Sequence, residues 1–345
     1  MTRSSGRAGG DRSRSRSLPD ALEQARELVD PALARALGRL EPGIGEVVNY
    51  HFGFAVGNAS GKAVRPALAL LSAEAAGAPA ERGLDGAVAV ELVHNFSLLH
   101  DDIMDGDRER HSRATAWTVF GEPRAILAGD ALASLSLQVL LDHGGPEPEP
   151  ERVRAAALLA DSTQRMIAGQ SQDLALEGRP DVTLDECLAM LSAKTAALLS
   201  CSCAIGAVLA GADDDLVARL LTFGEHVGIA FQAVDDQLGI WGEPELTGKP
   251  TWSDLRQRKS SLPVAAALQA DGPQLRRLLA RPSLSEADLA RIAQLVEEAG
   301  GRAWAAEEAD RRLQAALDEL DGAEIASNTR DGLAALARFI VTRAF

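Results

Sequence analysis

Apolar residues along most of this chain recur every three or four positions, which is the period of an amphipathic α-helix. Gly, Pro and Ser interrupt this pattern at Gly53–Gly61, at residues 144–150 and along Gly242–Pro263. No stretch alternates convincingly enough between apolar and polar residues to predict a strand. We therefore predict an all-α fold, whose helical pattern runs through Leu18–Leu40, residues 61–76, Leu84–Asp105, and residues 124–142, 151–177 and 214–241.

The two ends of the chain differ in pattern. Residues 1–17 are rich in Arg, Ser and Gly without apolar periodicity, which predicts a disordered tail. Residues 18–345 are predicted to form one all-helical domain. After Pro263 we expect three or four helices, separated at Pro282–Ser285, at residues 300–301 and near Gly322–Arg330.

Composition narrows the class further. Aromatic residues make up 4% of the chain, which disfavours sheets, and a net charge of −15 argues against nucleic acid and anionic membranes as partners. Three cysteines without framework spacing indicate a reducing compartment, so we expect a cytoplasmic protein. The longest uncharged run, Ala196–Ala212, has 17 residues and contains Ser, Cys and Gly. It favours a buried helix over stable membrane insertion.

Two acidic clusters interrupt apolar helical stretches. Asp101, Asp102 and Asp105 lie close together, with the first and last at i,i+4 on one helix face. A pair at Asp235 and Asp236 follows about 130 residues later. Close carboxylates in an apolar setting repel one another, and Mg²⁺ binds through one or two carboxylates plus substrate phosphates. The clusters therefore predict metal sites facing each other across a bundle, although an acidic cluster is also typical of a solvated helix end.

Lysine is used sparingly. Only Lys62, Lys194, Lys249 and Lys259 occur, and the remaining 31 of the 35 basic residues are Arg. Lysine is a compact point charge that planar arginine does not replace. Lys62 and Arg65 share a face at a predicted helix start, where free N–H groups favour anions. Surface solvation remains the alternative for this pair.

Residues that could bind a ligand or take part in catalysis follow one another in a recognisable order. They are Lys62, Arg65, His94, Asp101, Asp102, Asp105, Arg110, Lys194, Thr195, Phe231, Gln232, Asp235, Asp236, Lys249, Asp254 and Lys259. In this order the chain resembles the trans-isoprenyl diphosphate synthases, the polyprenyl synthetase family, from about Gly61 to Pro263. All four lysines fall on positions of the family's motifs.

The resemblance implies a fold, a reaction and a role for each motif. The fold is an isoprenoid-synthase-type helical bundle around a central active-site cavity, assembled as a homodimer. An allylic diphosphate ionises, and isopentenyl diphosphate attacks the cation and loses a proton, giving a C15 to C20 prenyl diphosphate. Three Mg²⁺ ions and fixed cations neutralise the leaving diphosphate. The implied metal ligands are Asp101, Asp102, Asp105, Asp235 and Asp236; the allylic diphosphate meets Arg110, Lys194 and Lys249; isopentenyl diphosphate meets Lys62, Arg65 and His94; and Phe96 closes the floor of the chain pocket.

The chain departs from the family pattern at several positions. Ala63 and His111 stand where the family usually has arginines, both on the isopentenyl side, and Ala114 replaces a proline. Gly239 stands at the third position of the second acidic motif. We hypothesise that Arg113 takes the place vacated at His111 and that the enzyme binds isopentenyl diphosphate with an elevated KM.

Alternative functions remain open. The two lost arginines favour a class I terpene cyclase, which acts on one prenyl diphosphate, whereas Lys62, Arg65 and His94 favour elongation. A non-catalytic subunit of a heteromeric synthase is a third possibility, against which the intact acidic clusters argue. A di-iron bundle needs two Glu-x-x-His motifs, and the chain has only Glu91…His94.

Overall fold

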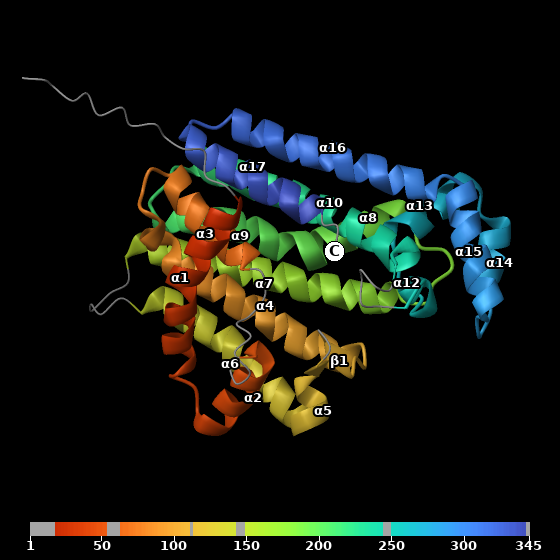
Figure 1. Cartoon of the computed structure of the whole chain (residues 1–345), viewed down its shortest axis with the longest axis horizontal. Helices are drawn as coiled ribbons and strands as arrows, with labels where there is room; N and C mark the ends of the chain where they lie inside the picture. The colour runs from red at the N-terminus through yellow and green to blue at the C-terminus, as the bar shows by residue number, and fades with distance from the viewer. Residues whose placement is uncertain (1–17, 54–62, 111–112, 143–148, 244–249, 343–345) are drawn as a thin grey trace, which may run out of the picture.

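The computed structural model of the chain is a bundle of helices packed in several layers (Figure 1). It describes residues 18–53, 63–110, 113–142, 149–243 and 250–342. The predicted tail at residues 1–17 lies outside this range. The elements of the first half are α1 (Leu18–Leu37), α2 (Pro42–Phe52), α3 (Val64–Ala75), the 3₁₀ turn η2 (Ala80–Gly83), α4 (Leu84–Met104), β1 (Glu109–Arg110), β2 (Arg113–Ala114), α5 (Ala116–Phe120), α6 (Glu122–Leu141) and α7 (Pro150–Leu176).

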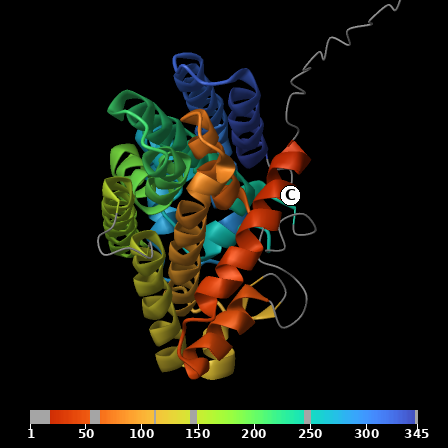
Figure 2. The same ribbon diagram turned by 90° about the vertical axis from the view of Figure 1, so that its left-hand side faces the viewer.

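The second half carries the remaining helices, which complete the bundle. Figure 2 shows α16 and α17 at the opposite end of the molecule from α5 and the start of α6. The elements are α8 (Leu184–Leu191), the π-helical turn η3 (Ser192–Ala196), α9 (Ala197–Leu209), α10 (Asp214–Trp241), α12 (Ser253–Arg256), α13 (Leu262–Asp271), α14 (Pro273–Leu279), α15 (Glu286–Glu298), α16 (Gly301–Asp321) and α17 (Ser327–Val341).

Helix α9 forms the centre of the core, and every one of its residues is buried. The predicted buried helix is therefore confirmed. Its small residues allow close neighbours: a Cβ atom at Gly206 would lie 1.9 Å from the carbonyl oxygen of Ala69 on α3. On the other side, a Cβ at Gly224 of α10 would lie 2.6 Å from the Cα of Ser200. The three cysteines are free and buried, as expected of small core residues.

Two stretches of the described chain are long and apolar enough to cross a membrane, judged by length and composition alone. In the stretch Leu184–Leu209, 67% of the most apolar window is buried within the bundle. In α6 that share is 39%. Buried core helices of soluble proteins pass the same test, so this result is weak evidence for a membrane span.

The all-α prediction is confirmed, but three details of it were wrong. No strand was predicted, yet β1 and β2 pair antiparallel after the first acidic cluster, with Arg110 opposite Arg113. Two-residue strands are too short to leave a periodic pattern. The stretch after Gly242 contains the short helix α12, and five described helices, α13–α17, replace the three or four expected because Gly272-Pro273 separates α13 from α14.

Candidate active site

The first acidic cluster lies at the C-terminal end of α4 and is already partly paired with a cation. Asp102 is 2% exposed, and its Oδ1 accepts hydrogen bonds from Arg110, with Nε and Nη2 both 2.7 Å away. Burial raises the pKa of Asp101 to about 6, with Lys194 opposing and Asp105 and Asp102 adding to the shift. Because Asp102 is engaged by Arg110, Asp101 and the exposed Asp105 are the members of the cluster best placed for a metal ion.

Lys194 and Thr195 lie on η3, a single π-helical turn between α8 and α9. Such turns are rare and are frequent at functional sites. Two glycines allow neighbouring helices to contact its backbone directly. A Cβ at Gly169 of α7 would lie 2.2 Å from the Lys194 nitrogen, and a Cβ at Gly228 of α10 would lie 2.6 Å from the Cα of Ala196. The turn is therefore clamped between α7 and α10.

Lys194 connects α7 with the first acidic cluster. Its Nζ lies 2.5 Å from Oδ2 of Asp173, and its charge is the leading influence that opposes the raised pKa of Asp101. Asp173 was not predicted to lie in the site, because an aspartate one turn after a glycine such as Gly169 is not distinctive in a helical sequence. Gln170, beside Gly169, has a buried side-chain amide without a hydrogen-bond partner among the described residues. Such a group points to a bound water or ligand.

The second acidic cluster is joined to η3 by a chain of hydrogen bonds. Thr195 Oγ1 donates to Gln232 Oε1 at 2.9 Å, and Gln232 Nε2 donates to Asp236 Oδ1 at 2.8 Å. The other oxygen of Asp236 accepts from the backbone nitrogen of Leu262 at 2.8 Å. Burial raises the pKa of Asp236 to about 7. Both oxygens of Asp236 are thus engaged, which leaves the half-buried Asp235 as the more accessible carboxylate.

Lys259 lies among carboxylates from three different elements. Burial opposes its charge, but Asp254, Asp105 and Asp173 outweigh that effect and raise its pKa. The next residue, Ser260, donates to the carbonyl oxygen of Leu176 at 3.1 Å and so fixes this segment to the end of α7.

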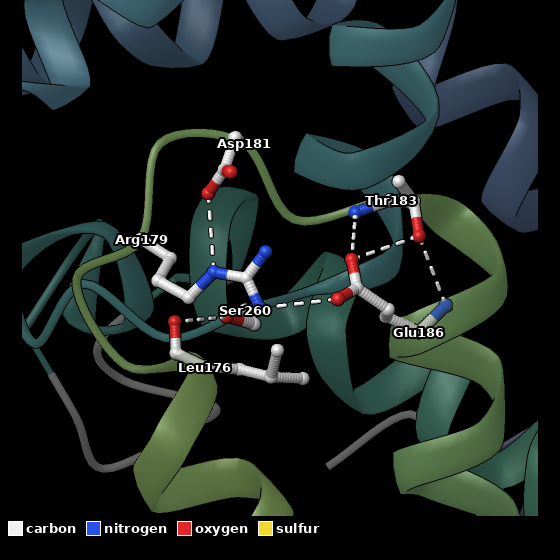
Figure 3. Close-up of polar contacts among 6 residues, drawn as sticks. All are labelled: Leu176, Arg179, Asp181, Thr183, Glu186 and Ser260. Atoms are coloured by element: carbon white, nitrogen blue, oxygen red, sulfur yellow. Dashed lines mark hydrogen bonds and ion pairs between the residues drawn. The ribbon is translucent and has the colours of Figure 1, made fainter.

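Figure 3 shows that Ser260 lies beside the connection between α7 and α8. There Arg179 bridges Asp181 and Glu186, at 3.1 and 3.0 Å. Glu186 and Thr183 form a capping box at the start of α8. The loop that receives Ser260 is therefore itself held in place.

The residues expected to bind isopentenyl diphosphate are only partly described. Lys62, His111 and Lys249 lie outside the described residues. Arg65 Nη1 lies 3.3 Å from Nε2 of His94. Burial, together with Arg65, His51 and Arg110, lowers the pKa of His94 well below its usual value. His94 is therefore neutral at pH 7, and its Nε2 accepts from Arg65.

Arg113, the hypothesised substitute for the missing arginine, is held by α2. Its Nη2 donates to the carbonyl oxygen of Tyr50 at 2.7 Å, and its guanidinium lies 4.9 Å from the centre of the Tyr50 ring. The Tyr50 hydroxyl in turn donates to the carbonyl oxygen of Ala114 at 2.8 Å. A move of Arg113 toward a diphosphate therefore requires the loss of its contacts with Tyr50.

Phe96 lies on the side of α4 that faces α6. It is 8% exposed, and its ring meets that of His100 edge-on at 4.9 Å. Nε2 of His100 lies 3.1 Å from the carbonyl oxygen of Ile126, and a Cβ at Gly129 would lie 2.3 Å from the same nitrogen. The ring of His100 thus packs against Phe96. His100 itself fits only because position 129 on α6 is a glycine.

The donor chemistry of the two clusters fits Mg²⁺ bound together with a diphosphate. Among the described residues, no group of three or more His, Cys, Asp or Glu side chains is arranged to hold a metal ion alone. Mg²⁺ prefers carboxylate oxygens and usually completes its six positions with water and substrate phosphates. Asp101 and Asp105 on one side and Asp235 on the other offer that incomplete set.

Comparison with known proteins identifies the family. A sequence model of the polyprenyl synthetase family matches residues 48–298. The (2E,6E)-farnesyl diphosphate synthase of Mycobacterium tuberculosis (strain ATCC 25618 / H37Rv) is 45% identical over 96% of this chain and 95% of its own length. A geranylgeranyl diphosphate synthase of the same strain is 43% identical over 88% of each. The crystal structure of a polyprenyl synthetase from Streptomyces coelicolor A3(2) matches with a TM-score of 0.87 and 50% identity, covering 94% of this chain and 100% of that one.

These relatives are named as synthases of prenyl diphosphates, which supports the prenyltransferase interpretation over a cyclase or a non-catalytic subunit. The chain belongs to the polyprenyl synthetase family and is a trans-prenyltransferase.

Proposed function

We propose that the enzyme condenses an allylic diphosphate with isopentenyl diphosphate to a C15 to C20 prenyl diphosphate in a Mg²⁺-dependent reaction. The observation that carries this proposal is the convergence of both acidic clusters on η3. Lys194 acts on Asp101 on one side, and Thr195 connects through Gln232 to Asp236 on the other. A diphosphate bound between the two clusters is surrounded by charged side chains that this hydrogen-bonded arrangement holds in place.

Within each acidic cluster, we assign some aspartates to bind Mg²⁺ and others to hold those ligands in position. Asp101, Asp105 and Asp235 are assigned to hold Mg²⁺, with three ions expected per site. Asp102 and Asp236 support them through their contacts with Arg110 and Leu262. When bound, Mg²⁺ supplies Lewis-acid neutralisation of the departing diphosphate.

The protein's own cations complete the allylic site. Lys194 is paired with Asp173 and is expected to donate to the diphosphate when substrate binds. Arg110 and Lys249 add fixed positive charge to the leaving group. The proton lost after condensation passes to the pyrophosphate, so the reaction needs no protein nucleophile.

Isopentenyl diphosphate is assigned to Lys62, Arg65 and His94. Because neutral His94 accepts from Arg65, it orients that guanidinium and adds no charge of its own. With Ala63 and His111 in place of arginines, the site has fewer cations, and the elevated KM remains our expectation.

Product length is proposed from Phe96 and from the relatives together. A farnesyl and a geranylgeranyl diphosphate synthase are 45% and 43% identical to this chain, so sequence identity does not separate C15 from C20. The buried Phe96, supported by His100, favours a closed pocket and hence a short product.

A homodimer is proposed from the outer faces of α6 and α7. Large apolar side chains that are 40–56% exposed lie on these neighbouring helices: Ile126, Leu127, Leu141, Val153, Ile167 and Leu174. A second copy of the chain covers this face in our proposal. We also propose a cytoplasmic location, supported by the three free cysteines.

Product analysis tests this function. Purified protein is incubated with Mg²⁺, labelled isopentenyl diphosphate and geranyl or farnesyl diphosphate, and the products are separated by chain length. We expect label in C15 to C20 diphosphates. Conversion of an allylic diphosphate alone into hydrocarbon or alcohol, without incorporation of label, would instead establish a cyclase. Absence of any turnover until a second subunit is added would establish the non-catalytic alternative.

A further inference from the structure

The turn η3 carries one polar side chain to which the proposed reaction gives no role. The turn has the sequence Ser-Ala-Lys-Thr-Ala, and its lysine and threonine, Lys194 and Thr195, are already assigned to the site. The remaining polar residue, Ser192, is half-buried at the start of the turn. Its Oγ donates to Oε1 of Glu225 on α10 at 2.8 Å. Ser192 therefore joins the turn to α10 without using a catalytic group.

The hydroxyl of Ser192 acts between helices. A serine inside a helix commonly donates to the carbonyl oxygen four residues earlier, on its own helix. Ser202 on α9 does so, because its Oγ donates to the carbonyl oxygen of Leu198 at 2.7 Å. The acceptor of Ser192 lies 33 residues away on another helix. The contact therefore fixes where η3 lies relative to α10.

The other polar side chains of η3 are engaged by groups of the site itself. Lys194 Nζ lies 2.5 Å from Oδ2 of Asp173, a contact that must loosen when the lysine donates to a bound diphosphate. Thr195 Oγ1 donates to Gln232, which continues the chain of hydrogen bonds to the second acidic cluster. The bond between Ser192 and Glu225 involves no group that is assigned to substrate or metal. It can therefore stay closed while Lys194 changes its partner.

The part of α10 that carries Glu225 is itself held by α16. The next residue, His226, has its Nδ1 3.3 Å from Nη1 of Arg312. Burial and the charge of Arg312 lower the pKa of His226, so this ring is neutral at pH 7 and its Nδ1 accepts. Arg312 Nε in turn donates at 2.7 Å to Oε1 of Glu308, which is 1% exposed. The acceptor of Ser192 thus extends from a backbone that α16 keeps in place.

We propose that Ser192 and Glu225 are positioning residues, whose hydrogen bond holds η3 in place while Lys194 and Thr195 act on the allylic diphosphate. The inference rests on the proposed function of η3. Neither Ser192 nor Glu225 touches the substrate, and both act through the position of the turn. Catalytic groups must be held to within about 0.5 Å of their working geometry, so loss of this bond should be seen mainly in the rate.

Removal of either partner tests this inference. The full-length enzyme is assayed with Mg²⁺ for kcat at saturating concentrations of both substrates, for the KM of each substrate and for calorimetric Tm. Ser192→Ala and Glu225→Ala should each lower kcat by about 10- to 100-fold. The KM for isopentenyl diphosphate should stay unchanged, because the ligands proposed for it lie outside η3 and α10. The double variant should be no slower than the slower single variant, since both changes remove the same bond.

A conservative variant and a matched control separate position from stability. Glu225→Gln keeps a side-chain oxygen that accepts the hydrogen bond but removes the charge, so it should retain most of the wild-type kcat. Ser200 lies outside η3, on α9, and its Oγ donates to the carbonyl oxygen of Leu221 on α10 at 2.7 Å. Ser200→Ala therefore removes the same kind of contact between helices. It should lower the Tm about as much as Ser192→Ala does and leave kcat unchanged.

The inference and the proposed function fail in different ways. Wild-type kcat in Ser192→Ala or in Glu225→Ala would overturn the inference, and so would a Ser200→Ala enzyme as slow as Ser192→Ala. A Glu225→Gln enzyme as slow as Glu225→Ala would also overturn it, because the charge and not the hydrogen bond would then be the cause. Incorporation of labelled isopentenyl diphosphate by the wild type would still support the synthase in each case. A wild type that incorporates no label would overturn the proposed function, and the inference with it.

Discussion

Replacing Gly169 by alanine should displace the catalytic residues Lys194 and Thr195, although Gly169 itself has no catalytic group. Gly169 lies on α7 and touches η3, the turn that carries Lys194 and Thr195. The new Cβ would lie 2.2 Å from the Lys194 nitrogen, 2.6 Å from its Cα and 2.7 Å from the carbonyl carbon of Ala193. All three atoms belong to the backbone, so no flexible side chain can move aside to relieve the contact.

The size of the effect follows from these separations. Comfortable non-bonded separations are about 3.5–4.0 Å, so α7 and η3 must separate by roughly 1 Å. Overpacking of this kind costs about 1–3 kcal/mol of unfolding free energy. With an unfolding entropy of about 2.1 cal/mol/K per residue, that corresponds to a Tm lower by roughly 1–4 °C for a chain of 345 residues. A shift of about 1 Å at a catalytic group can lower the rate by about 100-fold, so kcat should fall much more than stability.

The assay pairs calorimetric Tm with kcat at saturating concentrations of both substrates. Gly45→Ala is the matched control, because Gly45 lies within α2 and a Cβ there would meet nothing within 4 Å. The same substitution should stabilise that helix by about 0.5–1 kcal/mol and leave kcat unchanged. A Gly169→Ala enzyme with wild-type Tm and kcat would refute the clamp, since α7 and η3 could then separate at no cost.

Four other predictions concern charge, metal and substrate. Because the pKa of Asp236 rises from 3.8 to about 7, the folded chain binds this proton more tightly than the unfolded chain, so metal-free protein should lose stability as pH rises through that range. Asp236→Asn should flatten this loss in urea unfolding with EDTA; an unchanged pH profile would count against it. Asp101→Ala should lower kcat by orders of magnitude with an unaltered circular dichroism spectrum, and turnover by the wild type in excess EDTA would contradict the metal assignment. Phe96→Ala should lengthen the product on chromatography, whereas an unaltered product distribution would argue against a role in the pocket floor. Arg113→Ala should raise the KM for isopentenyl diphosphate and leave the KM for the allylic diphosphate unchanged. Equal changes in both KM values would argue against the hypothesis that Arg113 replaces the arginine missing at position 111.

Helices that bury one face could be predicted from the sequence, and shorter elements could not. The apolar period set the limits of α4 and α10 to within a few residues, and the composition of Ala196–Ala212 predicted the burial of α9. The β1–β2 ladder and α12 span two and four residues. Their conformation is decided by contacts with distant segments, such as that of Ser253 with Gly239, which no local pattern records.

The types of residue in the site could likewise be predicted, but their partners could not. The acidic clusters and Lys194 were found from the sequence, because a chain that otherwise uses arginine makes each lysine conspicuous. That Lys194 pairs with Asp173, 21 residues away, depends on how closely α7 approaches η3. This approach is set by Gly169, and nothing in the local sequence distinguishes that glycine from one that merely interrupts a helix. Gln170 shows the same limit, because its buried amide is recognisable as unsatisfied only once its surroundings are known.

Both acidic clusters lower the stability of the folded protein in the absence of ligand. This cost is consistent with a site whose carboxylates come from several elements. Burial raises the pKa of Asp101 and of Asp236, which means that their charged forms are disfavoured where they stand. Arg110 and Lys194 offset part of that cost by pairing with Asp102 and Asp173. A cation bound with a diphosphate offsets the remainder, so ligand binding and stability are coupled. Carboxylates gathered on a single helix would repel one another most strongly; spreading them over α4, α7, α10 and α12 lets separate packing contacts hold each one in place.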